Sequence, residues 1–548
     1  MHILDLDDDS LIIILSYILD TPLRSSKKHG LVCLSSICTR FRSVILPFLF
    51  RSVRWPHFQP SAEALGWGQP ETIAYPVVPK TILSNIRRFT LSCAFQFPTD
   101  RLVTMIGDMA SLSSFIFLDC NHPPSETVLD ALAQVPSLSS IDFCRTPLNL
   151  NTTPPSFSFT ALENLSIKCA WKLVSVSGGA PQDPATFKLR FHDPPDMTDK
   201  IINSLNRRSA ELAFSTQFIQ SNLAFLERVE IEGALFPFNI LRSSTWPRLH
   251  TLIFYGRPPM SQSVPIITLF GGMPKLEDLQ FRWSMRLVEE PQRDKFHFLP
   301  DSLIPKPKPG STPQTLNLTP LLPSLRSLTL SNVVPQDRIF QYLPTSLERL
   351  HLPTILEDGC GGAGMRLVNI QDIGVGLGPA AASSIMCDMK QSGARPVELR
   401  LTLSEMPSPT LIQEIADTLP GIQVLELGQA WYDAFPSETI FPESAYLTSL
   451  TPLTSLQELK LSLPFPSTSR NRRSTHFGPL SEELELAHAI AKVLPKLERV
   501  GFQCTFSYPE SVQKRVWDDW NEWAGYRVWR WSGGGVGVEW EERKGWGS

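Results

Sequence analysis

Three short motifs in the 548-residue sequence have residue types that could bind a metal ion or a phosphate group. The acidic run DLDDD at 5–9 supplies carboxylates but lacks the glycine and downstream glutamate of a calcium-binding loop. The stretch GCGGAG at 359–364 lacks the Lys-Ser/Thr pair of a phosphate-binding loop, and SGGGVGVEW at 532–540 lies near the end of the chain. We interpret the acidic run as a helix start and both glycine-rich stretches as turns.

The sequence also lacks the common catalytic and metal-binding patterns. It contains no GxSxG, HExxH or GxxxxGK[ST] motif, and its histidines are dispersed. The nine cysteines form no CxxC pair and no zinc-ligand spacing. We therefore predict no catalytic residue, no metal and no cofactor. An enzyme on an α/β frame stays as an alternative that no motif supports.

Composition favours a soluble intracellular protein with many short elements. Hydrophobic residues make up 42% and charged residues 19%, and the 48 prolines predict frequent element ends. A net charge of −4 gives no reason to expect a nucleic acid partner. The run LIIIL at 11–15 is too short to span a membrane, and the acidic start predicts no leader. Unpatterned cysteines are typical of reduced thiols, so we expect the cytoplasm, the nucleus or both.

One phrase recurs along the chain with the form L-x-x-L-x-L, as in VLPKLERVGF at 493–502 and LLPSLRSLTL at 321–330. Its last two apolar positions alternate like a short strand, so both point to one side. A helix-period stretch precedes many copies, for example 125–138 and 482–497, and a proline then ends the helix. The apolar positions are Ile86/Phe89/Leu91, Leu112/Phe115/Phe117, Leu138/Ile141/Phe143, Leu162/Leu165/Ile167, Leu226/Val229/Ile231, Leu249/Leu252/Phe254, Leu276/Leu279/Phe281, Leu325/Leu328/Leu330, Leu347/Leu350/Leu352, Ile422/Leu425/Leu427, Leu456/Leu459/Leu461 and Leu497/Val500/Phe502, with a defective copy at Pro396/Leu399/Leu401.

Repeats of about 25 residues predict a solenoid. The phrase resembles the leucine-rich repeat family over residues 83–505, which implies an α/β solenoid with parallel strands on a concave face and helices on a convex one. The family has Asn or Cys after the strand. Here only Cys120 matches that pattern, and other copies have residues such as Thr146 and Ala170 at the equivalent position. We therefore expect an irregular solenoid.

Residues between the strand leucines should face away from the helices, so they are candidates for binding a protein substrate. They are equally well interpreted as ordinary solvated strand positions. Loop insertions are expected at about 170–222, 299–323, 357–366 and 464–479. The candidate substrate-binding residues are Ser327, Thr329, Arg349, His351, Glu426 and Lys460.

The Trp-rich segment 506–548 is predicted to be a terminal cap on the last repeat. Trp517, Trp520 and Trp523 recur at helical spacing, whereas Trp529 and Trp531 alternate as in a strand. An exposed aromatic ligand platform is the alternative interpretation.

The first part of the chain lacks the repeated phrase. In residues 1–52, Asp7 to Ser10 favour a helix start, and two apolar stripes follow, so a helical cap on the repeats is one interpretation. Residues 53–82 then form a linker. A sharper interpretation comes from LSSICTRF at 34–41 and LPFLFRSVRW at 46–55, which resemble the F-box of fungal proteins with diverged repeats. Two positions depart from that pattern, Asp7 for proline and Ile13 for an acidic residue.

The F-box resemblance implies a three-helix domain that binds the Skp adaptor of a cullin ubiquitin ligase, with the repeats presenting a substrate protein. The alternative is a non-ligase scaffold that binds the adaptor or other proteins. By the resemblance, the residues that face the adaptor or support that face are Leu6, Leu11, Ile14, Leu15, Leu34, Ile37, Cys38 and Phe41.

Overall fold

The structure is a computed structural model. It describes residues 11, 32, 35, 38–55, 80–92, 99–120, 122–148, 157–168, 195–256, 266–283, 287–288, 296–297, 303–304, 321–334, 337–355, 376–429, 442–463, 481–503, 523–531 and 535–541. The chain divides into two compact units, Met1–Lys172 with Leu189–Ile240 and Leu173–Lys188 with Leu241–Ser548.

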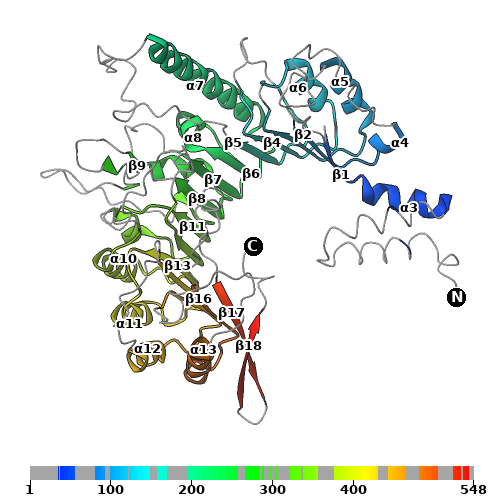
Figure 1. Cartoon of the computed structure of the whole chain (residues 1–548). Coiled ribbons are helices and arrows are strands. Elements are labelled where there is room, and N and C mark those ends of the chain that lie inside the picture. The colour runs from blue at the N-terminus through cyan, green and yellow to red at the C-terminus, as the bar shows by residue number, and fades with distance from the viewer. Residues whose placement is uncertain are drawn as a thin grey trace, which may run out of the picture. The chain divides into compact units, whose positions relative to one another are not determined.

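The first unit contains a parallel sheet whose strands follow one another in chain order (Figure 1). The strands are β1 (Ser52–Trp55), β2 (Arg88–Ser92), β3 (Ser114–Leu118), β4 (Ser140–Cys144), β5 (Asn164–Lys168) and β6 (Arg228–Glu232). Because β1 pairs in parallel with β2, the sheet already begins inside the segment predicted to be a linker.

Apart from α3 (Thr39–Leu49), the described helices of the first unit lie on one side of these strands. They are α4 (Lys80–Leu83), α5 (Thr99–Asp108), α6 (Glu126–Ala133) and α7 (Pro195–Asn222), with a 3-10 turn at η3 (Gly233–Leu235) and α8 (Phe238–Ser243) after it. The helix predicted within 125–138 is confirmed as α6, and the Ser125 side chain caps it by accepting from the Val128 backbone N–H. The long helix α7 shows that the loop prediction for 170–222 is wrong over its second half.

The core of the first unit is a stack of phenylalanines that come from successive strands. Phe117 and Phe143 stack with ring centroids 5.2 Å apart, and Phe143 meets Phe214 and Phe218 of α7 edge-on, both at 5.8 Å. Aromatic pairs in these geometries contribute about 0.5–1.5 kcal/mol each beyond their area burial. The repeat spacing stabilises the sheet because it places apolar residues side by side in successive strands, including the aromatic neighbours Phe117 and Phe143.

The second unit is also built from strands that follow one another in chain order, and it ends in an antiparallel hairpin. Its strands are parallel from β7 to β16, and β17 and β18 then run antiparallel. They are β7 (Thr251–Gly256), β8 (Asp278–Trp283), β11 (Ser327–Leu330), β12 (Arg349–Leu352), β13 (Glu398–Leu403), β14 (Val424–Gln429), β15 (Glu458–Leu461), β16 (Arg499–Gln503), β17 (Trp523–Arg530) and β18 (Val536–Glu541), with a separate short pair β9 (Leu287–Val288) and β10 (Phe296–His297).

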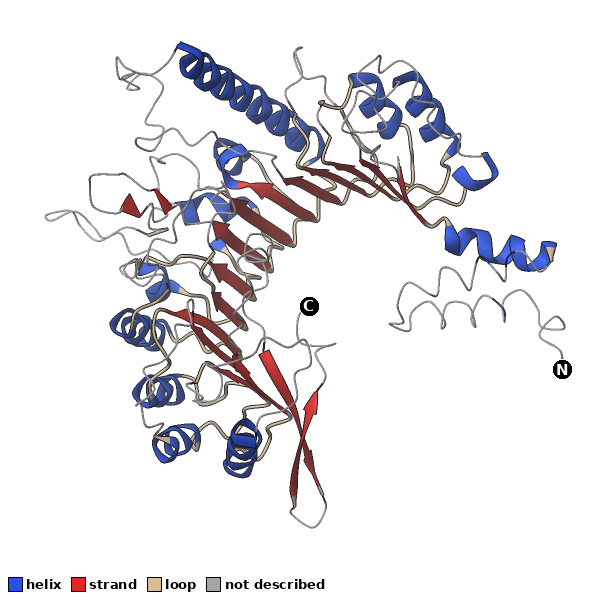
Figure 2. Ribbon diagram, viewed as in Figure 1, coloured by secondary structure: helices blue, strands red, loops and turns tan. Residues whose placement is uncertain are grey.

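Figure 2 shows that the described helices of the second unit lie on one side of its sheet. We call the opposite side the helix-free face. The helical elements are η4 (Ile266–Gly272), η5 (Arg338–Tyr342), α10 (Pro379–Ser392), α11 (Pro409–Thr418), α12 (Glu443–Leu450) and α13 (Ser481–Val493). The mixed α/β architecture with a mostly parallel sheet is therefore confirmed.

Every copy of the repeated phrase coincides with a strand, and the copies align in register. In the second unit Leu328, Leu350 and Leu399 are successive backbone partners, and all three are buried. Pro396 does not prevent β13 from forming in the defective copy, because it precedes the strand and removes no ladder hydrogen bond.

The turns after the strands contain hydrogen bonds that the sequence pattern did not predict. The Cys120 thiol lies 3.6 Å from the Leu91 carbonyl oxygen, and the Thr146 hydroxyl donates to the carbonyl of Phe117 at 3.2 Å. Thr146 thus reaches back to the preceding strand as Cys120 does. A threonine at this position therefore binds the turn to the preceding strand just as the cysteine does.

The hairpin of β17 and β18 corrects part of the prediction for the C-terminal segment. Trp523 lies in a strand and not in the predicted helix, whereas the strand predicted around Trp529 is confirmed. Trp517 and Trp520 lie outside the described residues. The hairpin is fixed to α13 because the Tyr526 hydroxyl donates to Glu483 at 2.6 Å, with both side chains buried.

Within the part of the chain that the structure describes, no helix is both long enough and apolar enough to cross a bilayer.

Candidate functional site

The helix-free face of the second unit carries charged side chains in rows that cross the strands. Because side chains alternate along a strand, the leucines of β12 to β15 point into the core and the residues between them point the other way. Parallel register then aligns His351 with Arg400, Glu426 and Lys460. Four polar residues from four different repeats therefore share one row.

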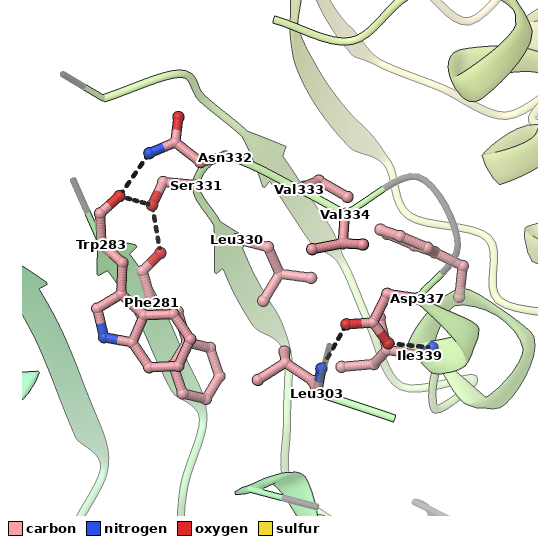
Figure 3. A pocket seen from close by; sticks show the side chains of 11 residues that line it. Phe281, Trp283, Leu303, Leu330, Ser331, Asn332, Val333, Val334, Asp337 and Ile339 are labelled. Atoms are coloured by element: carbon pink, nitrogen blue, oxygen red, sulfur yellow. Dashed lines mark hydrogen bonds between the residues drawn. The ribbon is translucent and has the colours of Figure 1, made fainter. Parts of the chain in front are cut away.

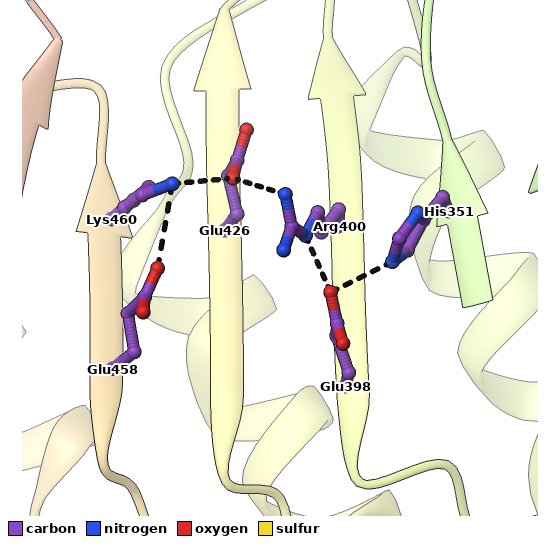
Figure 4. A network of polar contacts seen from close by, with 6 residues as sticks. All are labelled: His351, Glu398, Arg400, Glu426, Glu458 and Lys460. Carbon is purple, nitrogen blue, oxygen red and sulfur yellow. Dashed lines mark hydrogen bonds and ion pairs between the residues drawn. The ribbon is translucent and has the colours of Figure 1, made fainter. Parts of the chain in front are cut away.

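The first half of this row is built around one carboxylate. Glu398 Oε1 lies 2.8 Å from His351 Nε2 and accepts from Arg400 Nε at 2.6 Å (Figure 4). The Glu398 side chain is 15% exposed, whereas that of Arg400 is 40% exposed. The carboxylate is therefore held beneath the guanidinium group.

The second half continues across β14 and β15. Arg400 also approaches Glu426 at 3.6 Å, and Lys460 Nζ lies 3.3 Å from Glu426 and 3.4 Å from Glu458. The Lys460 side chain is only 7% exposed, so its charge is balanced almost entirely by these two carboxylates. We call the six side chains the charged network: His351, Glu398, Arg400, Glu426, Glu458 and Lys460.

The surroundings of Glu398 favour its ionised form. Burial opposes ionisation of Glu398, but the hydrogen bond from His351 and the positive charge of Arg400 outweigh it and lower the pKa of Glu398 to about 2. Glu398 therefore carries its negative charge at any pH near neutrality.

An aromatic side chain of the C-terminal hairpin borders the network. The Trp523 ring centroid lies 5.9 Å from Lys460 Nζ, which is within range of a cation–π contact. The ring also lies 3.5 Å from the position where a Cβ would stand on Gly428. An alanine at this position of β14 would place its Cβ in ordinary van der Waals contact with the indole.

The structure brings together three of the six predicted substrate-binding residues. His351, Glu426 and Lys460 belong to the charged network, and Arg349 is exposed on the same face of β12. Ser327 and Thr329 also point away from the leucines, but they are only 5% and 4% exposed. Their burial removes them from the accessible surface, so we leave them out of the candidate site.

Sequence reasoning missed Glu398, Arg400, Glu458 and Trp523. The first two were hidden because their repeat has proline at its first template position. The alternation ELRLTL at 398–403 was the available signal, since it places Glu398 and Arg400 on the opposite side of the strand from its leucines. No local pattern could have placed Trp523 beside Lys460, because the contact joins residues that are 63 positions apart in the sequence.

The N-terminal helical segment is described only in part. Helix α3 (Thr39–Leu49) begins after Cys38, whose sulfur accepts from the Phe41 N–H at 3.4 Å. Leu11 and Phe41 are buried together with Val44 and Ile45 in one small apolar cluster. Among the predicted adaptor-binding residues, Leu11 and Phe41 thus lie inside the helical segment and Cys38 at its edge. Leu6, Ile14, Leu15, Leu34 and Ile37 lie outside the described residues.

A small pocket in the second unit is lined by residues of β8, β11 and η5, including Phe281, Trp283 and Leu330 (Figure 3). The Asp337 carboxylate accepts from the backbone N–H groups of Leu303 and Ile304, as well as from that of Ile339. Burial raises its pKa to about 6 despite these hydrogen bonds. Both carboxylate oxygens of Asp337 already accept hydrogen bonds from backbone N–H groups. We therefore interpret the pocket as the place where residues 303–304 are held against the sheet.

The network places charged side chains of both signs on one face of the sheet, so it can bind charged groups of a partner. Within the described residues, no group of three His, Cys, Asp or Glu side chains is arranged to hold a metal ion. No family model matches this chain. The curated proteins likewise contain no match to it.

Proposed function

We propose that this protein is an F-box substrate receptor of a cullin-type ubiquitin ligase. Its N-terminal helices would bind the Skp adaptor, and its repeat sheet would hold a substrate protein. The observation that carries the proposal is the charged network, because it exposes a built polar surface on the helix-free face of an α/β repeat unit. The protein itself would perform no chemistry and would act by holding the substrate near the ubiquitin donor.

The N-terminal segment supports the adaptor half of the proposal. The cluster of Leu11, Phe41, Val44 and Ile45 gives the segment a core of its own. Val32, which lies in a helix of the same segment, is 52% exposed. An exposed valine beside a folded helical core is the kind of apolar position that adaptor binding would cover.

The test is co-purification of the full chain with a Skp adaptor and a cullin. Val32→Asp should abolish adaptor capture while leaving the fold intact, because the residue is exposed. Leu11→Asp with Phe41→Asp should abolish capture by disrupting the helical core. Ser43→Asp, at an exposed position of α3, is the matched control and should leave capture unchanged.

Normal adaptor capture by the chain with both core substitutions would rule out the F-box assignment. Capture of the adaptor without cullin would favour the alternative function, a scaffold that binds the adaptor but directs no ubiquitination. Such a receptor would work in the cytoplasm or the nucleus, where the ligase components reside.

A further inference from the structure

Along β12 to β16 the most exposed charged side chains on the helix-free face are arginines, whereas the hairpin adds both Arg527 of β17 and the exposed Glu539 of β18. Arg349 of β12, Arg499 of β16 and Arg527 of β17 are exposed, and Arg400 is the most exposed member of the charged network. The network carboxylates lie lower, with side chains 15% to 22% exposed. A partner approaching this face would meet arginines first.

The carboxylates of the network are already committed to cations. Glu398 is shared by His351 and Arg400, while Glu426 and Glu458 are bound by Lys460. In contrast, the Arg349 guanidinium forms no ion pair within the described part of the chain. Its register partner Glu398 points to His351 instead, which leaves Arg349 able to accept an external anion.

We infer that this arginine-bordered strip binds an extended acidic segment of a partner protein through aspartate and glutamate side chains. The inference deepens the proposed function by naming the chemistry of the substrate segment, and it rests on that function for the identity of the partner. Guanidinium groups bind carboxylates with two parallel hydrogen bonds, so arginine is better suited to this task than lysine.

The spacing of the arginines sets the length of the segment. Arg349 and Arg499 lie on strands separated by four steps of the ladder. At about 4.8 Å per strand, this is about 19 Å along the sheet. An extended chain of about six residues covers that distance. A short acidic stretch could therefore contact the arginines at both ends of the strip.

The network also favours carboxylates over phosphates as the ligand groups. Glu398, Glu426 and Glu458 are less exposed than Arg400, and the lowered pKa of Glu398 keeps that carboxylate negatively charged. A phosphate group of charge about −2 would suffer more repulsion from them than a carboxylate of charge −1. A basic segment would instead be repelled by the more exposed guanidinium groups of Arg349, Arg400 and Arg499.

The test is a fluorescence anisotropy titration of the full chain with labelled peptides of about six acidic residues, the length set above. Matched peptides carry Asn and Gln, phosphoserine, or lysine at the same positions. We expect binding of the acidic peptide that weakens as salt is added, and weak or no binding of the others. Arg349→Glu should weaken binding about tenfold, since it removes one charge-assisted contact and adds repulsion.

Two variants control for charge and for folding. Arg101→Glu changes the net charge equally, but it lies on α5 of the other unit, so binding should not change. Arg349→Gln removes the charge without reversing it, should still weaken binding, and covers the case in which Arg349→Glu folds poorly. Equal affinity of the Arg349 and Arg101 variants would overturn the inference, as would preferential binding of the lysine or phosphoserine peptide.

Failure of this inference can be told apart from failure of the proposed function. Adaptor capture depends on the N-terminal helices and should be normal in Arg349→Glu. A chain that captures the adaptor but ignores the acidic peptide would refute the inference alone. A chain that binds the acidic peptide but not the adaptor would refute the F-box assignment alone.

Discussion

The side chain of Gln503 on β16 acts as a backbone partner for Gln429 on β14. Its Oε1 accepts from the Gln429 N–H at 2.8 Å, and its Nε2 donates to the Gln429 carbonyl at 3.0 Å. The intervening strand β15 ends at Leu461, whose partner is Leu427, so it does not extend far enough to satisfy these groups. One amide side chain thus completes the ladder where a strand is too short.

Gln503→Met should therefore destabilise the end of the sheet. The substitution keeps the side-chain length but leaves the Gln429 N–H and carbonyl without their partner, which costs about 1–3 kcal/mol. Urea unfolding would measure the loss, and amide hydrogen exchange at Gln429 should accelerate. Gln423→Met is the control, because this exposed residue uses only its backbone in the ladder. Unchanged exchange at Gln429 would contradict the role of the side chain.

The carboxyl group of Glu398 predicts a loss of stability in acid. Its pKa is lowered from 4.5 to about 2 in the folded state, so its ionisation favours folding above pH 4.5 and this contribution disappears as the pH falls towards 2. Glu398→Gln should cost about 1–2 kcal/mol at pH 7, after allowance for solvent screening of a partly exposed group. Urea unfolding between pH 2 and 7 should show the two proteins converging at the acid end. A constant difference across this range would exclude the ionic origin.

The carboxyl group of Asp337 predicts the opposite dependence. Its pKa is raised from 3.8 to about 6, so burial of the ionised form opposes folding. This cost is absent below about pH 4 and complete above about pH 6, so it lowers stability as the pH rises through that window. Asp337→Asn should remove this pH dependence, and thermal unfolding of the two proteins at pH 4 and pH 7 would show it. An unchanged pH profile in the variant would refute the assignment.

Asn332 is predicted to stabilise its turn by two separable effects. Its backbone has φ of 50°, and its amide donates to the carbonyls of Trp283 and Ile355 and accepts from the Ile355 N–H. Asn332→Ala loses the hydrogen bonds and strains the left-handed backbone, so we expect a loss of about 2–4 kcal/mol. Asn332→Gly loses only the hydrogen bonds and should be less destabilising by about 1 kcal/mol. Equal melting temperatures for the two variants would show that the backbone conformation contributes nothing.

The attachment of the C-terminal hairpin depends on the buried pair of Tyr526 and Glu483. Tyr526→Phe removes the hydroxyl that donates to Glu483 at 2.6 Å and should cost about 1–3 kcal/mol. Limited proteolysis should then cut within 523–541 earlier than in the parent protein. Tyr342→Phe on η5 is a matched control, because its hydroxyl accepts from Arg338 on the same element and should not affect the hairpin. Equal protection of the hairpin in Tyr526→Phe would refute its role as an anchor.

The strands were predictable from the sequence because the apolar alternation is local and is repeated in every copy. Phe115 and Phe117, for example, fall at the expected positions and are both buried. The charged network was predictable only in part, since His351, Glu426 and Lys460 could be placed on the correct face but not paired. Their pairing depends on register between repeats of unequal length, separated by insertions such as the one between β12 and β13.

Other elements escaped prediction because tertiary contacts decide them. The helix α7 lies in a polar segment with a weak apolar pattern, and its Phe214 and Phe218 are buried by the phenylalanines of the sheet. Trp523 has helical spacing with earlier tryptophans, yet it pairs with Gln503 in an antiparallel ladder. Local periodicity does not show which distant segment will pack against or pair with a given stretch of the chain.

The antiparallel direction of β17 limits where further repeats could be added to the sheet. A new repeat needs a parallel neighbour on each side, but the last parallel strand is occupied by a hairpin whose Tyr526 is tied to α13. Added repeats would therefore have to be inserted upstream of β16, where one parallel strand follows another. The hairpin of β17 and β18 thus ends the run of parallel strands, and duplication of a repeat would lengthen the sheet only between existing parallel strands.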